Sequence, residues 1–409
     1  MIEQARRIAV IGGSRIPFCR SNTVYSSKSN MDLLSAALQG LIDRFDLHGK
    51  QFDEVIAGAV TTHSRDWNLA REALQSTTMS PLTPGITLQQ ACATSLQGAL
   101  MIGAKIATGQ IECGIAAGTD TTSDFPVVYG KKFSARVAKL GAARSFKQRM
   151  AAFKGFRPSE LKPVVPANGE PRTGLAMGQH CDRMAREWKI SREDQDKLAV
   201  DSHLNAARAY DEGFFDDIVT PWAGVSRDNN IRPDSSVEKL ATLRTVFSTG
   251  GEATMTAANS TPLTDGAAAV LLASEDWAKA NNLPIQAYIT AGRTSAVDYV
   301  NDEGLLMAPT VAVAEMLQAT GLSLQDFDFY EIHEAFAAQV LCTLAAWESE
   351  DYCKNRLGLE QALGSIDREK MNVKGGSVAV GHPFAATGSR IIGSLGQILE
   401  EAGSGRGLI

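Results

Sequence analysis

The sequence predicts a layered α/β protein. A strand-like run leads directly into a helix-like run at three places, residues 86–104, 329–347 and 373–399. This alternation is typical of helices packed on sheets. The chain has 409 residues, of which 44% are hydrophobic and 21% charged, as in a globular protein with a large core. We therefore expect buried sheets covered by helices.

The order of the elements indicates two similar halves. Apolar residues recur at helical spacing from Leu33 to Phe45, after Ser29 and Asn30, and a strand-like run follows over residues 54–60. Either polar residue could cap the helix start. A second such pair follows later, with a helical pattern over residues 311–320 and a strand pattern over residues 327–332. We expect a first half over residues 1–120 plus 249–275, and a second over residues 276–409.

Residues 121–248 differ in character and predict an inserted subdomain. They contain several prolines, a turn at residues 228–230 and a helical pattern over residues 192–212. Within them, residues 129–165 hold ten basic residues and one acidic residue, a net charge of +9 in a chain whose total is -6. We expect an anionic ligand or surface there. The phosphates of a nucleotide-like substrate, an acidic partner subunit and a membrane surface with anionic lipids remain open.

Several classes of protein are disfavoured. The net charge of -6 gives no reason to expect nucleic acid, and no run approaches the roughly 20 apolar residues of a membrane span. The N-terminus lacks a signal-peptide layout, so a cytoplasmic protein is expected. The six cysteines form no C-x-x-C pair. His333-Glu334 resembles the start of a zinc-protease H-E-x-x-H helix, but Ala337 stands where the second histidine would be. No metal is therefore implied. Gly12 and Gly13 lack the third glycine of a dinucleotide fingerprint.

Cys92 is the candidate nucleophile. It follows the first strand-like run and precedes the helical run in Ala91-Cys92-Ala93-Thr94-Ser95. A helix N-terminus stabilises a nearby anion by about 0.3 to 2 kcal/mol, which favours the thiolate. We expect this effect to lower the thiol pKa to about 7 at best, so that a second activating group would still be useful.

Two histidines lie at the other junctions. His382 is in Gly381-His382-Pro383, where the proline disfavours a helical backbone and the glycine permits close approach. His333 follows a strand-like run, and we expect Glu334 in the first turn of the next helix, where a carboxylate is favoured. Taken alone, His333 could equally be a buried structural histidine.

The three motifs together resemble the thiolase family. Residues 92–97, C-A-T-S-L-Q, match its nucleophile motif, residues 333–336, H-E-A-F, match its H-E-A-F or N-E-A-F motif, and residues 381–390, G-H-P-F-A-A-T-G-S-R, match its G-H-P motif. Residues 259–269 and the long insertion extend the match over the whole chain. H-E-A-F together with residues 229–232, N-N-I-R, is most similar to 3-ketoacyl-CoA thiolases that form the β subunit of a fatty-acid oxidation complex.

The resemblance implies a fold and a reaction. The fold would be two similar α/β halves stacked as five layers (αβαβα), with the insertion covering the site. Cys92 would attack the keto carbonyl of a 3-ketoacyl-CoA, His382 would act as base, and His382 with His333 would hold the oxyanion. Gly381 and Glu334 would support them. CoA and acyl-CoA would be substrates, and no bound cofactor is implied.

Binding residues and partners follow from the same resemblance. Met177, Ser248 and Thr261 fall where the family contacts, or lies close to, the pantetheine of CoA. A homo-oligomer, either a dimer or a tetramer, is expected, together with a possible hetero-oligomer with a hydratase/dehydrogenase α subunit. The basic stretch of residues 129–165 would then dock that subunit or a membrane surface.

One family motif is not found in the sequence. Thiolases of this kind carry a second active-site cysteine in a C-terminal C-x-G-G-G or C-A-A-G-G motif, and the chain ends at Ile409 before such a motif. We expect that a C-terminal strand segment of roughly 25 residues is missing and that Cys92 is acylated without turnover. Other expectations remain: an acetoacetyl-CoA-forming acetyl-CoA acetyltransferase, and an impaired thiolase-like binding or structural subunit. The G-H-P and H-E-A-F motifs disfavour a ketoacyl synthase, because those enzymes carry their two histidines in different motifs.

Overall fold

The computed structural model describes residues 5–164 and 169–409, and the chain forms two compact units. The larger unit contains the chain up to Asp124 and from Met177 onward, and the smaller contains residues 125–176. The smaller unit is shorter than the insertion expected over residues 121–248, because residues 177–248 fold with the larger unit. The boundaries of the two expected halves stay a prediction.

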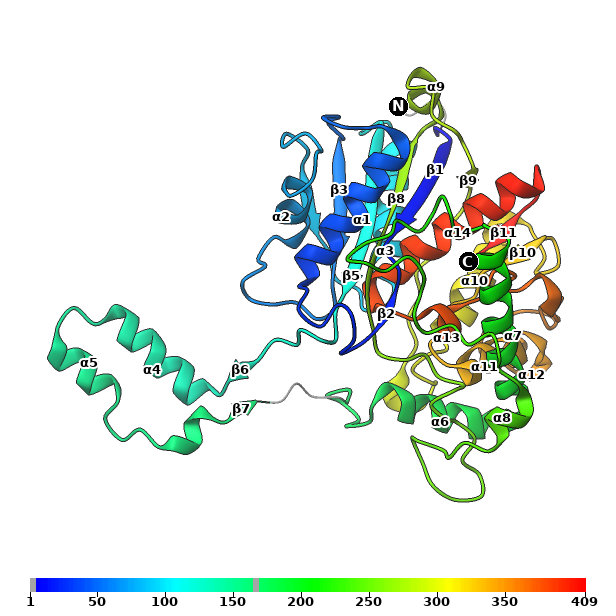
Figure 1. Cartoon of the computed structure of the whole chain (residues 1–409). Helices are drawn as coiled ribbons and strands as arrows, with labels where there is room; N and C mark the ends of the chain where they lie inside the picture. Colours follow the sequence, from blue (N-terminus) through cyan, green and yellow to red (C-terminus); the bar gives the residue numbers. More distant parts are fainter. Residues whose placement is uncertain (1–4, 165–168) are drawn as a thin grey trace. The chain divides into compact units, whose positions relative to one another are not determined.

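A mixed sheet forms the centre of the larger unit (Figure 1). Its longest strand, β8, lies between β5 and β1, runs antiparallel to both and is buried along its whole length. β3 pairs in parallel with β4 and β5. In the described residues, the strand order is β4 (Gly85–Thr87), β3 (Glu54–Gly58), β5 (Cys113–Asp120), β8 (Thr264–Ser274), β1 (Ile8–Arg15) and β9 (Ala287–Ile289), with β2 (Cys19–Arg20) also paired to β8.

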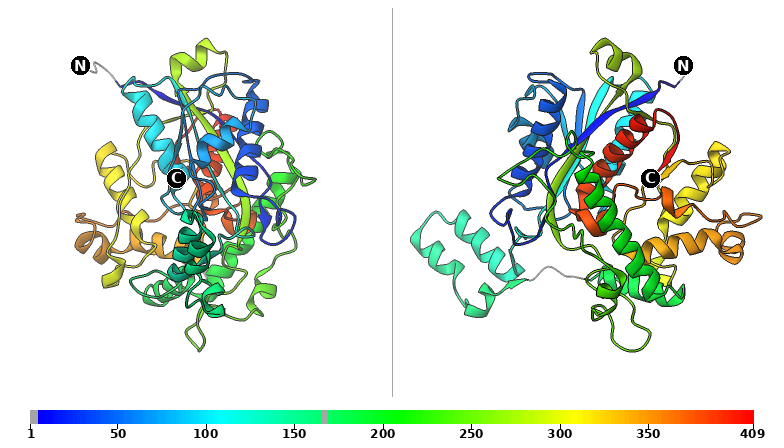
Figure 2. Two further views of the ribbon diagram at one scale, coloured as in Figure 1. Left: turned by 90° about the vertical axis from the view of Figure 1, so that its left-hand side faces the viewer. Right: turned by 45° about the vertical axis from the view of Figure 1, so that its right-hand side comes forward.

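Helices cover both faces of this sheet (Figure 2). On β5, Ile115 and Ala117 face the helices α1 and α2, whereas Ala116 faces α3 and α14. Both faces of the strand are apolar, as a strand buried on both sides requires. The helices are α1 (Asn30–Phe45), α2 (Leu69–Gln75), α3 (Thr94–Ala107) and α14 (Thr387–Ala402).

The first helix begins as its sequence predicts. Ser29 Oγ accepts a hydrogen bond from the backbone of Asp32, and the Asp32 carboxylate accepts one from the backbone of Ser29. This capping box satisfies amide groups that have no partner inside the helix. Of the two candidate caps, Ser29 is therefore the one used, and the predicted helix and the following strand are confirmed.

Eight further α-helices of the larger unit lie between residues 177 and 380. α7 confirms the helix predicted over residues 192–212, and α10 begins three residues earlier than predicted because Pro309 fits in its first turn. The strand predicted over residues 327–332 is reduced to β10 (Phe329–Tyr330), which pairs in parallel with β11 (Gly407–Leu408). The helices are α6 (Met177–Glu187), α7 (Arg192–Asp211), α8 (Val237–Ala241), α9 (Glu275–Ala280), α10 (Ala308–Thr320), α11 (Ala337–Glu348), α12 (Glu350–Asn355) and α13 (Ser377–Val380).

The smaller unit is a helical hairpin closed by two short strands. β6 (Val128–Tyr129) pairs antiparallel with β7 (Pro163–Val164), and between them lie α4 (Lys131–Ala142) and α5 (Phe146–Ala152). Four aromatic rings form its centre, those of Tyr129, Phe133, Phe153 and Phe156. No residue of α4 is buried, so this unit exposes most of its side chains.

None of the helices in the part of the chain that the structure describes has the length and hydrophobicity needed to cross a membrane.

Candidate active site

Cys92 lies in the turn between β4 and α3. Ala91, the residue before it, has φ 45°, a left-handed conformation that is uncommon for a residue other than glycine. Thr94 holds this turn, since its Oγ1 accepts from the Gln90 amide at 2.8 Å and donates to the Ala91 carbonyl at 2.7 Å. The strained turn presents the Cys92 side chain just before α3, and such strain is common at functional sites.

His382 lies between α13 and α14, in the predicted glycine-rich junction. Gly381 has φ 103°, and a Cβ atom there would lie 2.7 Å from the Thr264 side chain, so this position requires glycine. The imidazole is 3% exposed, and its Nδ1 lies 2.6 Å from Thr387 Oγ1. One end of the ring is therefore held by the first residue of α14.

The other end of His382 faces the cysteine. Its Nε2 lies 3.1 Å from Cys92 Sγ, although the two residues are 290 positions apart in the sequence. The ring of His333 lies 4.1 Å from the ring of His382, centroid to centroid. The structure thus brings the three predicted catalytic side chains together, in the arrangement of a nucleophile with an adjacent base.

Desolvation favours the neutral form of all three groups, although Cys92 itself is only half-buried. Burial, reinforced by the Asp120 carboxylate, raises the pKa of the Cys92 thiol to about 12. Burial also lowers the pKa of His382 well below its ordinary value, and burial with the Arg390 charge lowers the pKa of His333 to about 3. The expectation that the start of α3 lowers the Cys92 pKa is wrong, because desolvation of the thiolate exceeds the effect of the helix end. His382 must therefore take the proton during attack.

Glu334 occupies a different place from the one predicted. The helix α11 begins at Ala337, so Glu334 precedes the helix and does not lie in its first turn. Its buried carboxylate accepts from Ser202 Oγ at 2.7 Å, from Asn372 Nδ2 at 2.6 Å and from the Val378 amide at 3.1 Å. These bonds join the segment of His333 to the segment before His382. Glu334 therefore stabilises the positions of both histidine segments through these hydrogen bonds.

Two of the residues predicted to lie near CoA adjoin this group. Thr261 Oγ1 donates to the Ser377 carbonyl at 2.9 Å, and Ser377 Oγ contacts His333. Met177 packs in an apolar cluster with Phe336. The buried Oγ of Ser248 has no hydrogen-bond partner among the described residues. The roles of these three residues in binding stay predictions.

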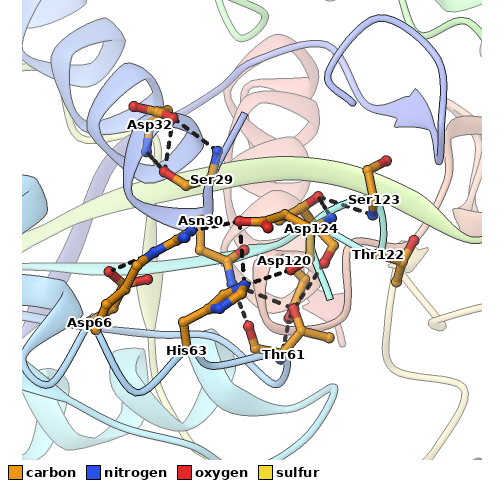
Figure 3. Close-up of polar contacts among 12 residues, drawn as sticks. Ser29, Asn30, Asp32, Thr61, His63, Asp66, Asp120, Thr122, Ser123 and Asp124 are labelled. Atoms are coloured by element: carbon orange, nitrogen blue, oxygen red, sulfur yellow. Dashed lines mark hydrogen bonds and ion pairs between the residues drawn. The ribbon is translucent and has the colours of Figure 1, made fainter. Parts of the chain in front are cut away.

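Asp120, at the end of β5, is a buried residue of the site that sequence reasoning missed. Its carboxylate accepts from the amides of Val60 and Thr61, from Thr61 Oγ1, and from the amide of Ala385, three residues after His382. Figure 3 shows Asp120 beside Thr61, in a network that extends to His63 and Asp124. Burial raises the Asp120 pKa, and the amide donors oppose that shift. Asp120 thus fixes the loop of His382 to the central sheet.

The predicted turn at residues 228–230 also supports this loop. Asp228 forms a bidentate ion pair with Arg15 at 2.6 and 2.8 Å, and both side chains are almost completely buried. Asn230 Nδ2 donates to the Ala379 carbonyl at 3.1 Å. The turn therefore connects β1 to α13, immediately before His382.

Among the described residues, no group of three or more histidine, cysteine, aspartate or glutamate side chains could hold a metal ion. The cysteines other than Cys92 are buried. The contact between Cys92 Sγ and His382 Nε2, with His333 beside it, supports attack by the Cys92 sulfur on a carbonyl with His382 as base.

Known proteins share this fold and these motifs. Residues 8–276 match the thiolase N-terminal domain and residues 283–409 the thiolase C-terminal domain. The 3-ketoacyl-CoA thiolases of Shewanella loihica and Shewanella woodyi are 41% and 40% identical to this chain over 408 residues, which cover 98% of this chain and 93% of each relative.

Solved structures are also similar. The Bacillus anthracis acetyl-CoA acetyltransferase has a TM-score of 0.80 and 27% identity, covering 99% of this chain and 95% of that one. Human mitochondrial 3-ketoacyl-CoA thiolase in complex with CoA has a TM-score of 0.78 and 28% identity, covering 98% and 93%. With both domain matches and these relatives, the chain belongs to the thiolase family.

Proposed function

We propose that this protein is a 3-ketoacyl-CoA thiolase, an acyltransferase that cleaves a 3-ketoacyl-CoA with CoA in fatty-acid β-oxidation. The observation that carries the proposal is the 3.1 Å contact between Cys92 Sγ and His382 Nε2, with His333 beside it. Relatives at about 40% identity bear this name. The reaction needs no resident cofactor, and CoA and acyl-CoA are its substrates.

The first half of the reaction forms an acyl-enzyme. Cys92 Sγ attacks the keto carbonyl as His382 Nε2 takes the thiol proton, and the bond between the keto carbon and C2 breaks. His382 gives up that proton and C2 gains one, so His382 is neutral again when acetyl-CoA leaves. Donors beside the reacting carbonyls stabilise negative charge that develops on oxygen. The neutral ring of His333 is suited to that role because its Nε2 has no partner among the described residues.

The second half, which turnover requires, transfers the shortened acyl group to CoA. Release of more than one acetyl-CoA per protein would show that the expectation of acylation without turnover is wrong. The CoA thiol attacks the Cys92 thioester, its proton passes to His382, and the cysteine sulfur leaves and recovers a proton from His382. The same base thus serves both half-reactions.

The test is intact-mass spectrometry after incubation with 3-ketooctanoyl-CoA, together with an assay of released acetyl-CoA. A hexanoyl adduct, two carbons shorter than the substrate chain, is expected on the wild-type protein and not on Cys92→Ser. Cys353→Ser is the matched control, because a serine hydroxyl can replace the thiol that contacts the Ala346 and Trp347 carbonyls. An adduct on Cys92→Ser, or none on the wild type, would contradict the proposal and favour a binding or structural subunit.

The structural similarity to an acetyl-CoA acetyltransferase supports an alternative function, the formation of acetoacetyl-CoA from acetyl-CoA. If the protein forms acetoacetyl-CoA, acetyl-CoA alone should acylate Cys92, and adducts from longer 3-ketoacyl-CoA chains should form at least tenfold more slowly, roughly the discrimination that pocket size provides. Comparable rates with both substrates would instead support the broader thiolase.

We also propose that the protein is a cytoplasmic homo-oligomer that associates with a hydratase/dehydrogenase subunit through the smaller unit. The support is electrostatic: residues 129–165 carry a net charge of +9, and the one acidic side chain, Glu160, is occupied by Arg136. Because Arg136 also donates to the Ala152 and Lys154 carbonyls, it is less suited to contact a partner. The exposed residues Lys131, Lys132 and Lys139 are better placed.

Reversing Lys131, Lys132 and Lys139 to glutamate should abolish co-purification with the dehydrogenase subunit, and should leave acylation of Cys92 unchanged. Lys50, Lys279 and Lys354, changed in the same way, provide a control with equal net charge. Retained association, or loss of binding to anionic liposomes only, would contradict the subunit contact, and the second result would identify a membrane surface as the partner.

A further inference from the structure

His333 has two ring nitrogens in different surroundings. Its Nδ1 lies 2.9 Å from Ser377 Oγ, whereas its Nε2 is buried and has no hydrogen-bond partner among the described residues. A neutral imidazole carries one proton, so one nitrogen donates and the other accepts. The nitrogen that carries the proton decides whether Nε2 can donate to a substrate oxygen.

Ser377 Oγ is contacted from two sides. Arg390 Nη2 lies 3.1 Å away and His333 Nδ1 lies 2.9 Å away. A guanidinium group can only donate hydrogen bonds, so Ser377 Oγ accepts from Arg390. The hydroxyl has a single proton, and within the described part of the chain its acceptor is His333 Nδ1. Ser377 is fully buried, so bulk water does not offer another partner.

This hydrogen-bond order determines the tautomer. If Ser377 donates to Nδ1, the proton of His333 is on Nε2. The opposite tautomer would point two hydrogens at each other or leave the buried Ser377 hydroxyl proton without an acceptor, which costs about 1–3 kcal/mol. A preference of that size corresponds to a ratio of about fivefold to over a hundredfold between the two forms.

His382 needs the reverse arrangement. Its Nε2 faces the Cys92 thiol and has to accept the thiol proton, so its own proton belongs on Nδ1, where Thr387 Oγ1 lies 2.6 Å away. The two rings are 4.1 Å apart and yet require opposite tautomers. The difference is that a cationic donor, Arg390, orients the hydroxyl beside His333.

We propose that Ser377 and Arg390 are positioning residues that hold His333 in the Nε2–H tautomer, so that its Nε2 donates to the substrate thioester oxygen. The inference rests on the proposed thiolase function for the role of that donor, although the tautomer can be tested without it. Arg390 acts through Ser377, and its buried position next to Glu331, 4.0 Å away, keeps its guanidinium in place. The Arg390 charge also opposes protonation of His333 and contributes to its low pKa.

The first test is spectroscopic and needs no substrate. The sequence contains six histidines, so ¹⁵N-histidine labelling gives a simple spectrum, in which His333→Asn identifies the His333 signals. In the wild type, the two-bond proton–nitrogen couplings should show a protonated Nε2 and an unprotonated Nδ1. In Ser377→Ala, the Nδ1–H form should become populated. A protonated Nδ1 in the wild type, or an unchanged tautomer in Ser377→Ala, would overturn the proposal.

A matched control lies on the same helix as Arg390. Ser389→Ala removes an equally buried hydroxyl, one that donates to the Ala116 carbonyl at 2.8 Å and has no recorded contact with His333. It should leave the His333 tautomer unchanged. Thermal unfolding of every variant separates loss of folding from loss of orientation, and a tautomer change in Ser389→Ala equal to that in Ser377→Ala would also overturn the proposal.

The second test uses acylation of Cys92. Ser377→Ala should slow acylation in proportion to the fraction of His333 that leaves the Nε2–H form, about twofold if the two forms become equally populated, without a matching change in KM. Asparagine has an amide donor and no tautomers, so Ser377→Ala in a His333→Asn background should not slow acylation further. An equal loss in both backgrounds would overturn the tautomer argument. If no variant is acylated, the proposed function fails, and the couplings still decide the tautomer.

Discussion

The catalytic site and the smaller unit differ in how their charged groups are exposed. At the site, burial raises the Cys92 pKa and lowers those of both histidines, which favours the neutral form of each reacting group before a proton moves. In the smaller unit, helix α4 has no buried residue, and a net charge of +9 over residues 129–165 is exposed. Electrostatic effects are large where water is excluded and small where it is present. Substitutions in the two regions should therefore differ in size.

The largest effect is expected at His382. His382→Gln should slow acylation of Cys92 by on the order of a thousandfold, because the thiol has a pKa of about 12 and His382 is the base that contacts it. Quenched-flow mass spectrometry measures the rate. In the variant, the rate should rise about tenfold per pH unit over the neutral to mildly alkaline range, as the thiolate fraction does. A rate within tenfold of the wild type would show that His382 is not the base.

A large loss of stability is expected at Asp228. Asp228→Asn leaves the buried Arg15 charge without its ion-pair partner, and breaking a buried pair costs about 3–5 kcal/mol. Urea unfolding of the larger unit measures this loss. The control is Asp211→Asn, which breaks the exposed pair with Arg227 and should change the free energy of unfolding by about 0–1 kcal/mol. If both variants lost the same free energy of unfolding, burial of the Arg15–Asp228 pair would not explain its effect on stability.

A smaller effect should appear in the dependence of stability on pH. The pKa of His333 is about 3 in the folded protein and about 6.5 in the unfolded protein. Below about pH 6.5, the unfolded state therefore binds more protons than the folded state. Stability is therefore lost as the pH falls. Between about pH 7.5 and about pH 5, wild type should lose about 2 kcal/mol more than His333→Asn.

Other groups near His333 titrate as well, so the comparison uses the difference between the two proteins. Burial raises the pKa of Glu331 to about 7, which acts in the opposite direction, and Glu334, His382 and Arg390 also lie near the ring. These groups are present in both proteins, and their contributions largely cancel. Parallel pH curves for the two proteins would mean that His333 does not carry the predicted shift.

The sequence predicted the main features of the fold because they depend on local patterns. The capped helix α1, the strand β3 and the helix α7 follow from apolar spacing and from Ser29. Cys92, His333 and His382 were found because each lies in a recognisable motif at a strand-to-helix junction. Their proximity depends on tertiary structure, which joins residues 290 positions apart.

The residues that support the site could not be predicted in this way. Asp120 bonds to Ala385 across 265 positions and Arg15 pairs with Asp228 across 213, and neither pair has a local pattern. The incorrect prediction of a low Cys92 pKa has a similar cause, because burial depends on the whole fold. Glu334 was misplaced because the helix begins three residues later than its apolar pattern indicates.

The smallest effect is expected from Glu160→Gln in the smaller unit. The change is the same in chemistry as Asp228→Asn, since a carboxylate paired with arginine becomes an amide. Here, however, the pair belongs to the smaller unit, its side chains stay 17% and 9% exposed, and Arg136 also donates to the Ala152 and Lys154 carbonyls. The unfolding transition of the larger unit should not move, while hydrogen exchange in α4 and α5 should become faster. A shift of the main transition comparable with that of Asp228→Asn would mean that the two units are not distinct in how they stabilise charge.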